Sequence, residues 1–215
     1  MNITFISAPA AGKGLLSSML NEKYGFPHIS IGDLLRGVDD EKVKKQLENG
    51  EFVDNELIAK LLKDRLNKSD CKDGFILDGF PRNMTQISIY EEVCERANEK
   101  DNIIIVLDIP REVGEKRILG RRVCLNCGNV YNDLFPSSKS KVPGICDHCG
   151  HELVQRTDDN LETYERRYDT YLKETKPVID YFEARGNVYH VDGSLSADET
   201  FKKIEEIIGG YNDKH

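Results

Sequence analysis

Apolar residues gather in four short continuous runs along the chain, and between these runs apolar positions recur every three or four residues. Continuous apolar runs are typical of strands that are buried on both faces of a parallel sheet. Segments with the longer period are typical of helices that bury one side. The pattern therefore predicts four strands, at residues 3–6, 74–78, 102–108 and 187–191.

Helices are predicted between and after these strands. Gly25 stands where a left-handed residue would end the first helix, and Ser196 with Glu199 forms a capping box that opens the last one. Because strands and helices alternate, we expect right-handed βαβ units and an α/β fold with a doubly wound parallel sheet. The first predicted helix ends at residue 24, and the others cover residues 40–49, 54–66, 84–97, 111–122, 160–184 and 196–211.

The segment that joins the first strand to the first helix is Ser-Ala-Pro-Ala-Ala-Gly-Lys-Gly-Leu, at residues 7–15. A strand, a loop of small residues, Lys13 and a helix are the parts of a phosphate-binding loop, in which backbone N–H groups and the helix N-terminus surround phosphates. The general motif has Gly where Ser7 stands and Ser or Thr where Gly14 stands. An ordinary tight turn of small residues is the alternative interpretation.

The composition is that of an ordinary globular chain. Its 215 residues suffice for one domain with insertions or for two small domains, with 39% hydrophobic and 32% charged residues. The net charge of −8 argues against nucleic acid or an anionic membrane as the main partner, so local arginines must supply any phosphate binding. No apolar run has the length of a transmembrane helix and no basic stretch precedes the first strand, so we expect a cytoplasmic protein.

Residues 123–153 interrupt the alternation of strands and helices and are rich in Cys, Gly, Pro, Ser and Asn. A segment of this length without a helix is usually a lid or a separately folded insert. Two Cys-x-x-Cys pairs within it predict a closed tetrahedral zinc site with a structural role. A redox Cys-x-x-Cys is the alternative, although it does not need two copies. The zinc ligands would be Cys124, Cys127, Cys146 and Cys149, whereas Cys71 and Cys94 are expected to be packing residues.

Arginines follow the predicted strand ends and flank the cysteine-rich segment. Arg117 and Arg121 are four residues apart and would project from one face of the predicted helix at residues 111–122. Doubly wound sheets bind ligands at the carboxyl ends of their strands, and guanidinium groups suit phosphates. We therefore expect a phosphate site formed by Arg36, Arg82, Arg117, Arg121, Arg156 and Arg167.

Together these segments resemble the adenylate kinase family, in the long form that carries a zinc-binding LID, over nearly all 215 residues. The Gly-Lys-Gly ending of the first loop is similar to the family's phosphate loop, from which Ser7, Ala10 and Leu15 depart. Asp-Gly-Phe-Pro-Arg at residues 78–82, with Gln86 four residues on, is similar to the family's most diagnostic segment. The other matching segments are residues 31–36, 120–123, 130–131, 156–159, 166–167 and 191–193.

The resemblance implies a P-loop fold in three parts and the reaction ATP + AMP ⇌ 2 ADP with Mg²⁺. ATP, AMP and ADP would be the partners of a monomer. The parts would be a core of residues 1–29, 54–119 and 158–215, a small helical AMP-binding insert at residues 30–53, and a zinc LID at residues 120–157. The catalytic cations would be Lys13, Arg82, Arg121, Arg156 and Arg167.

The resemblance also implies two sets of nucleotide contacts. Arg36 and Arg82 would hold the acceptor phosphate, Gln86 would contact the adenine edge, and Asp33 with Asp78 would hold Mg²⁺ through water. ATP would be bound by Ala10, Ala11, Gly12, Lys13, Gly14, Leu15, Arg117, Arg121, Val130, Tyr131 and Leu195. AMP would be bound by Ile31, Arg36, Glu51, Phe52, Val53, Gly79, Phe80, Pro81, Arg82, Gln86, Arg156 and Arg167.

Two further departures from the family pattern bear on the acceptor. Ile31 replaces a Thr beside the AMP base, and the segment between Arg36 and Glu51 is several residues shorter than usual. Three alternatives therefore stay open: a nucleoside monophosphate kinase with another base preference, a weakly active relative that senses nucleotides, and a zinc ribbon that binds nucleic acid. The negative net charge and the few Lys and Arg residues of the insert weigh against the zinc ribbon.

Overall fold

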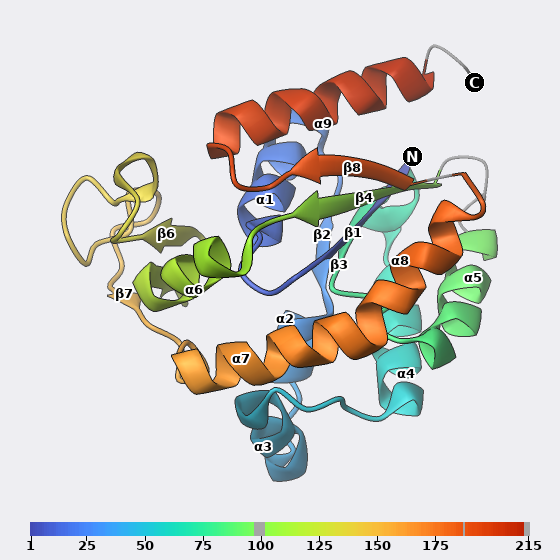
Figure 1. Cartoon of the computed structure of the whole chain (residues 1–215), viewed down its shortest axis with the longest axis horizontal. Helices are drawn as coiled ribbons and strands as arrows, with labels where there is room; N and C mark the ends of the chain where they lie inside the picture. The colour runs from blue at the N-terminus through green and yellow to red at the C-terminus, as the bar shows by residue number, and fades with distance from the viewer. Residues whose placement is uncertain (97–101, 187, 213–215) are drawn as a thin grey trace.

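The computed structural model describes residues 1–96, 102–186 and 188–212, and its centre is a five-stranded parallel sheet (Figure 1). The strand order is β2-β3-β1-β4-β8, and every neighbouring pair is parallel. The predicted α/β class with a doubly wound parallel sheet is therefore confirmed. The strands are β1 (Asn2–Ser7), β2 (His28–Ser30), β3 (Phe75–Asp78), β4 (Asn102–Asp108) and β8 (Val188–Asp192).

Helices cover both faces of this sheet (Figure 1). One face packs against α1 (Lys13–Tyr24) and α9 (Ala197–Asn212). The helices α7 (Leu161–Thr170) and α8 (Lys176–Glu183) are joined by a π-helical turn, Tyr171–Thr175, and α8 packs on the other face. The remaining helices are α2 (Ile31–Arg36), α3 (Glu41–Asn49), α4 (Asn55–Leu66), α5 (Ile87–Arg96) and α6 (Arg111–Gly120).

The continuous apolar run of β4 is buried because its side chains alternate between two cores. Ile105 belongs to the core that contains Leu20 of α1, whereas Val106 belongs to the core that contains Phe182 of α8. Both β4 side chains are completely buried. Since burying a large aliphatic side chain contributes about 1.5–3 kcal/mol, a strand with two covered faces gains at almost every position.

The predicted helix ends follow the local capping chemistry. Gly25 has φ 74° and ends α1 in the left-handed conformation. Ser196 Oγ accepts from the Glu199 N–H, and the Glu199 carboxylate accepts from the Ser196 N–H, as the capping box predicts. Asp54 accepts from two N–H groups at the start of α4. These helix ends are confirmed.

Several sequence expectations need correction. The predicted helix at residues 111–122 ends at Gly120, because Arg121 is extended (φ −64°, ψ 135°) and begins a strand. The short elements β2 and α2 were not predicted, since only one of the three β2 residues is fully buried and the apolar run is too short to show a period. The π turn interrupts the predicted helix at residues 160–184. Asn187 lies outside the described residues.

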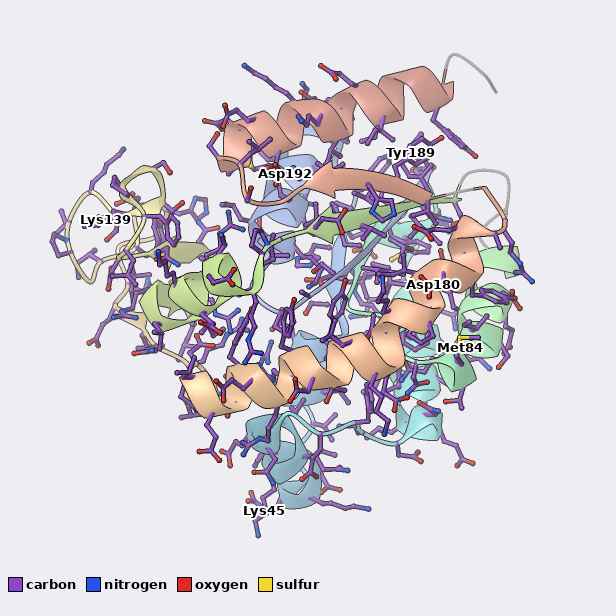
Figure 2. The ribbon with its side chains drawn as sticks, in the orientation of Figure 1. Lys45, Met84, Lys139, Asp180, Tyr189 and Asp192 are labelled. Carbon is purple, nitrogen blue, oxygen red and sulfur yellow. The ribbon has the colours of Figure 1, made fainter. Side chains whose placement is uncertain are left out.

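Residues 123–153 contain short antiparallel strands, where no regular period was expected. The strands β5 (Arg121–Cys124), β6 (Val130–Asn132) and β7 (Leu153–Val154) form a second sheet in the order β6-β5-β7. This small sheet lies beside α6, away from the central sheet (Figure 1). Lys139 lies at the left edge of the view, whereas Lys45 lies at its lower edge on α3 (Figure 2).

No helix in the part of the chain that the structure describes is both long enough and apolar enough to cross a membrane.

Candidate active site

A cavity of about 1170 Å³ opens at the carboxyl ends of the central strands. Its walls come from the loop after β1, the segment after β3, α2 with the end of α3, the small sheet, and α7. Every residue assigned from the sequence to ATP or AMP lines this cavity, and so do Asp33 and Asp78. The fold therefore brings residues from all parts of the chain to one site.

The cavity is cationic although the whole chain is acidic. Among the described residues that line it, eight are Lys or Arg and four are Asp or Glu. The chain as a whole has a net charge of −8. Clustered cations in a cleft with protein walls attract an anion more strongly than the same charges on an open surface. The site is suited to a ligand with several negative charges.

The loop after β1 has the backbone geometry of a phosphate-binding loop. Gly12, with φ 100°, caps the N-terminus of α1, and a Cβ at this φ would be strained. Lys13 Nζ donates to Ser7 Oγ at 2.7 Å and lies 3.9 Å from Asp78 Oδ1. Desolvation lowers the pKa of Lys13, and the nearby Arg82 and Arg121 lower it further against the opposing effect of Asp78. Lys13 is thus held across the loop by the hydroxyl of Ser7, which stands where the family pattern has Gly.

Ala10, the second departure in this loop, has φ 63°. A residue with a Cβ in the left-handed region costs about 1–2 kcal/mol, a cost that Gly largely avoids. The loop therefore keeps a conformation that favours Gly while carrying Ala, and it stores backbone strain beside the cavity.

The segment after β3 is held by its own hydrogen bonds. Gly79 has φ 79°, and its carbonyl accepts from Arg82 Nε at 2.7 Å. The Arg82 N–H donates to Gln86 Oε1 at 2.8 Å, and the Phe80–Pro81 peptide is cis. This folding of the segment fixes both Arg82 and Gln86 at the cavity.

The remaining arginines are oriented by carboxylates. Arg121 forms a bidentate pair with Asp159, whose side chain is fully buried. Arg167 Nη2 donates to Asp158 at 2.7 Å and to the Leu47 carbonyl at 3.0 Å, so it joins α7 to α3. Such pairs fix the guanidinium groups before any ligand binds.

Arg156 lies 3.8 Å from Asp33, which also pairs with Arg36 at 2.6 Å. Desolvation, together with the neighbouring Arg36 and Arg121, lowers the pKa of Arg156 to about 10. Arg36 and Arg121 both repel Arg156, so binding of a polyanion would stabilise all three side chains.

Arg117 and Arg121 do not share a helix face as expected, because the helix ends between them. Arg117 donates instead to the Gly193 carbonyl at 2.7 Å and to the Ala11 carbonyl at 3.2 Å. It also donates to the Leu195 carbonyl at 3.4 Å, so it joins the first loop to the segment after β8. Both arginines still line the same cavity.

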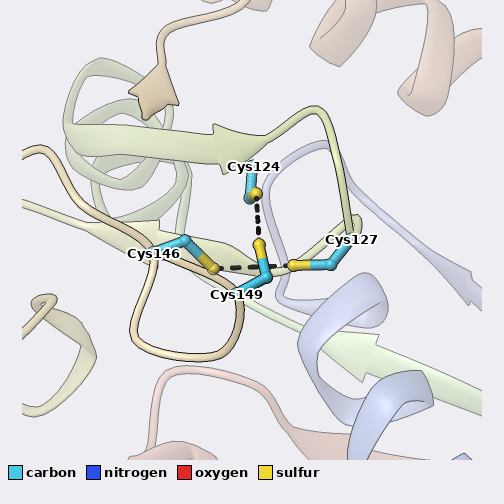
Figure 3. A group of neighbouring side chains, drawn as sticks. All are labelled: Cys124, Cys127, Cys146 and Cys149. Carbon is cyan, nitrogen blue, oxygen red and sulfur yellow. Dashed lines mark hydrogen bonds between the residues drawn. The ribbon is translucent and has the colours of Figure 1, made fainter. Parts of the chain in front are cut away.

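The four predicted zinc ligands converge in the small sheet (Figure 3). The Sγ atoms of Cys124, Cys127, Cys146 and Cys149 all lie within 4.8 Å of one another. The Cys124–Cys149 and Cys127–Cys146 sulfur distances are 3.4 and 3.5 Å, too long for disulfide bonds. Four converging sulfur donors fit a closed tetrahedral metal site.

The isolated cysteines were expected to pack in the core, and Cys71 does so. It is buried, and its sulfur contacts Arg65 and Asp70. The side chain of Cys94 lies outside the described residues.

Tyr131, expected beside the ATP base, lines the cavity and also reaches the cysteine cluster. Its hydroxyl lies 3.5 Å from Cys146 Sγ and accepts from the Asp147 N–H at 2.9 Å. Burial raises the pKa of Tyr131 to about 12, so the phenol stays protonated. The tyrosine therefore links the cysteine cluster to the wall of the cavity.

Sequence reasoning assigned no role to several residues that orient the site. Asp158 and Asp159 hold the two arginines on either side of the cavity, and His28 Nε2 lies 3.3 Å from Asp78 Oδ2. The acidic pair that begins two residues after Arg156 was a usable signal for Asp158 and Asp159. No pattern in the sequence connects His28 with Asp78, because the contact depends on the pairing of β2 with β3.

A parallel sheet, a lysine-bearing loop before a helix, and converging arginines define a nucleotide-binding phosphotransferase of the P-loop class. Comparison with known proteins agrees. The family model described as Adenylate kinase matches residues 5–187. The adenylate kinase of Archaeoglobus fulgidus is 41% identical over 214 residues, which cover 97% of this chain and 98% of the relative.

Other relatives give the same result. The adenylate kinase of Thermodesulfovibrio yellowstonii is 42% identical over 97% of this chain and 99% of the relative. That of Clostridium tetani is 38% identical over 99% of this chain and 100% of the relative. The chain belongs to the adenylate kinase family.

Proposed function

We propose that the chain transfers the γ-phosphoryl group of ATP to AMP, reversibly, and forms two molecules of ADP. The observation that carries this proposal is a cationic cavity that is lined by both the lysine-bearing loop and the Gly79–Gln86 segment. Family membership supports the same reaction.

ATP would bind at the loop after β1. The backbone N–H groups around Gly12, Lys13 and Gly14 and the N-terminus of α1 would surround its phosphates, with Lys13 on the β and γ groups. Arg117 and Tyr131, which line the same cavity, would flank the base and the phosphates. The Leu195 segment, held by Arg117, would close the outer side of the base.

AMP would bind at the Gly79–Gln86 segment. Arg36 and Arg82 would grip its phosphate, and the Gln86 amide would face the base beside Ile31 and Val53. Ile31 is 4% exposed and has no hydrogen-bonding side chain, so the base would meet an apolar wall there. Gln86 is then the side chain that selects the base by hydrogen bonding.

Transfer itself would need charge neutralisation and positioning. In-line phosphoryl transfer spreads negative charge over three oxygens, and preorganised cations stabilise that charge. Lys13, Arg121, Arg156 and Arg167 are the side chains we assign to the transferring group. Because Asp158 and Asp159 fix two of them in advance, little reorganisation is needed during transfer.

Magnesium is proposed as the cofactor bound with ATP. Asp78 and Asp33 offer carboxylate oxygens in the cavity, the donor type that Mg²⁺ prefers, and both would hold it through water. When bound, the ion neutralises charge on the β and γ phosphates. Asp78 lies beside Lys13, and Asp33 lies beside Arg36.

We propose zinc as the metal of the cysteine cluster, with a structural role. The small sheet buries few apolar side chains besides the cysteines themselves, so a metal is needed to stabilise it. Residues 120–157 would then act as a LID that excludes water from the cavity, residues 30–53 as the AMP-binding insert, and the rest as the core.

The cysteine cluster has a direct test. Metal analysis of protein purified without chelator should find about one Zn²⁺ per chain. Cys146→Ser should lower the melting temperature while the central sheet stays folded, because the ligand is lost only from the small sheet. Cys71→Ser is the matched control for a buried cysteine outside the cluster. Zinc-free protein, or a disulfide between the two cysteine pairs, would contradict the assignment.

We further propose a monomer in the cytoplasm. The residues that we assign to both nucleotides line one cavity of one chain, so catalysis would need no second copy. No disulfide joins the cysteines that the structure describes, which suits a reducing compartment. Sedimentation at micromolar concentration tests the monomer.

A coupled assay tests the function. With MgATP and AMP, the wild type should form two ADP for each AMP consumed. Initial rates with AMP, GMP, CMP and UMP would detect another base preference. Ile31 does not select against one, because its side chain forms no hydrogen bonds with a base. ADP binding without any turnover would instead favour a nucleotide sensor and contradict the kinase.

A further inference from the structure

A closed set of hydrogen bonds surrounds the Gln86 amide. Gln86 Oε1 accepts from the Arg82 N–H at 2.8 Å, and Gln86 Nε2 donates to Asn55 Oδ1 at 2.9 Å. Asn55 Nδ2 donates to Thr85 Oγ1 at 2.9 Å, and Thr85 Oγ1 donates to Asn83 Oδ1 at 2.7 Å. Asn83 Oδ1 also accepts from the Gln86 backbone N–H at 3.1 Å.

The direction of every bond in this set is determined. A backbone N–H can only donate, so Gln86 must present its oxygen to Arg82, and Asn83 must present its oxygen to the Gln86 N–H. Asn83 Oδ1 then receives the Thr85 hydroxyl proton, which leaves Thr85 Oγ1 to accept from Asn55 Nδ2. Asn55 therefore offers its oxygen to Gln86. Both ends of the set fix the same orientation of the Gln86 amide.

Gln86 is 1% exposed and lines the cavity at the proposed acceptor end. An amide has two N–H donors and two lone pairs on its oxygen, and the bonds to Asn55 and Arg82 use one of each. Toward the cavity, the amide can still donate once and accept once, in a fixed order. A flipped amide would set donor against donor at Arg82 and acceptor against acceptor at Asn55.

We propose that Asn55 is a positioning residue that holds the Gln86 amide in this orientation, so that the acceptor site selects a 6-amino purine over a 6-oxo purine. The inference rests on the proposed function, in which Gln86 faces the acceptor base. Adenine presents an N6 donor and an N1 acceptor, whereas hypoxanthine presents an O6 acceptor and an N1–H donor. The two bases have nearly the same shape, and only the order of donor and acceptor is inverted.

Inosine monophosphate, which carries hypoxanthine, is therefore the probe that isolates this order. Each mismatched buried polar group costs a factor of roughly 5 to 150, so we expect the wild type to prefer AMP in kcat/KM by about 100-fold or more. Asn55→Ala removes one of the two restraints on the amide and makes the flip easier. The AMP preference should then fall about five- to tenfold, with the KM for ATP unchanged.

Conservative and surface variants separate orientation from stability. Asn55→Asp keeps an acceptor for Gln86 Nε2 at the first turn of α4, where a carboxylate is also favourable, and should retain the preference within about twofold. Thr85→Ala, at an exposed position, should lower the preference in the same direction but less. Asn67→Ala, at the other end of α4 and outside the cavity lining, is the matched control and should change nothing.

The experiment measures kcat/KM for AMP and for inosine monophosphate at saturating MgATP in all five proteins. An unchanged preference in Asn55→Ala, from an active enzyme, would overturn this inference and leave the proposed function standing. A wild type that phosphorylates neither acceptor would overturn both. A preference that falls in Asn55→Ala and Thr85→Ala and is retained in Asn55→Asp would establish Asn55 as the positioning residue.

Discussion

The two loops that follow the neighbouring strands β1 and β3 both line the cavity but differ in how they keep their geometry. The loop after β1 departs from the family pattern at Ser7, Ala10 and Leu15, yet it keeps its backbone turn and its lysine. The segment after β3 has the full Asp-Gly-Phe-Pro-Arg pattern, and it is held by side-chain hydrogen bonds. A phosphate loop acts mainly through backbone N–H groups, so it tolerates side-chain changes that the acceptor segment would not.

Lys13 is the side chain of the loop after β1 on which phosphoryl transfer should depend most, so its removal should have the largest effect. Lys13→Ala should lower kcat roughly 100- to 1,000-fold, because the cation that neutralises the transferring group is lost in a desolvated site. Lys202→Ala, an exposed lysine on α9, is the matched control. Steady-state rates with MgATP and AMP measure both, and near-normal turnover in Lys13→Ala would remove this lysine from the mechanism.

The next prediction concerns the acceptor segment. Arg82→Ala should weaken the acceptor side by roughly 10- to 150-fold, in the KM for AMP or in kcat, because a charge-assisted contact to phosphate is lost. The KM for ATP should change little. Arg185→Ala, an exposed arginine paired with Glu91, serves as the control. Equal losses of ATP and AMP affinity in Arg82→Ala would show that the two ends are assigned wrongly.

Restoring the family pattern in the loop after β1 should have the smallest effect. Leu15→Thr adds one hydroxyl near the phosphates, worth roughly 2- to 12-fold in the KM for ATP. Ala10→Gly removes the strain at φ 63°, and the greater freedom of the unfolded Gly chain offsets part of that gain. The double variant should lower the KM for ATP several-fold and leave the KM for AMP nearly unchanged. If it instead restored transfer to an inactive wild type, the chain would be a nucleotide sensor.

The same comparison explains what the sequence predicts and what it does not. The buried strands and the capped helices were predictable because apolar periods and caps are local signals, as β4 and Gly25 illustrate. The extended conformation of Arg121 was not predictable. It follows from the pairing of β5 with β6, and the apolar pattern of residues 111–122 carries no sign of that pairing. Short elements such as β2 carry too few residues for a period to appear.

The candidate site was predictable in membership but not in its contacts. Motifs assigned Lys13 and Arg82 to a nucleotide site and the four cysteines to a separate metal site, because each motif has a fixed local geometry. The Ser7–Lys13 bond, the left-handed Ala10 and the Asn55–Gln86 contact were not predictable, since they depend on tertiary packing or on a conformation that Ala rarely adopts. The roles assigned to these residues stay predictions for the experiments above.

The proposed reaction requires that the two loops hold the two substrates of one transfer within a single cavity. Two adenosines joined through a chain of phosphates would span both ends at once, so inhibition by this compound tests the claim most directly. We expect competitive inhibition against both ATP and AMP, with one molecule bound per chain and binding weakened by Lys13→Ala and by Arg82→Ala. Competition with only one of the two nucleotides would contradict it.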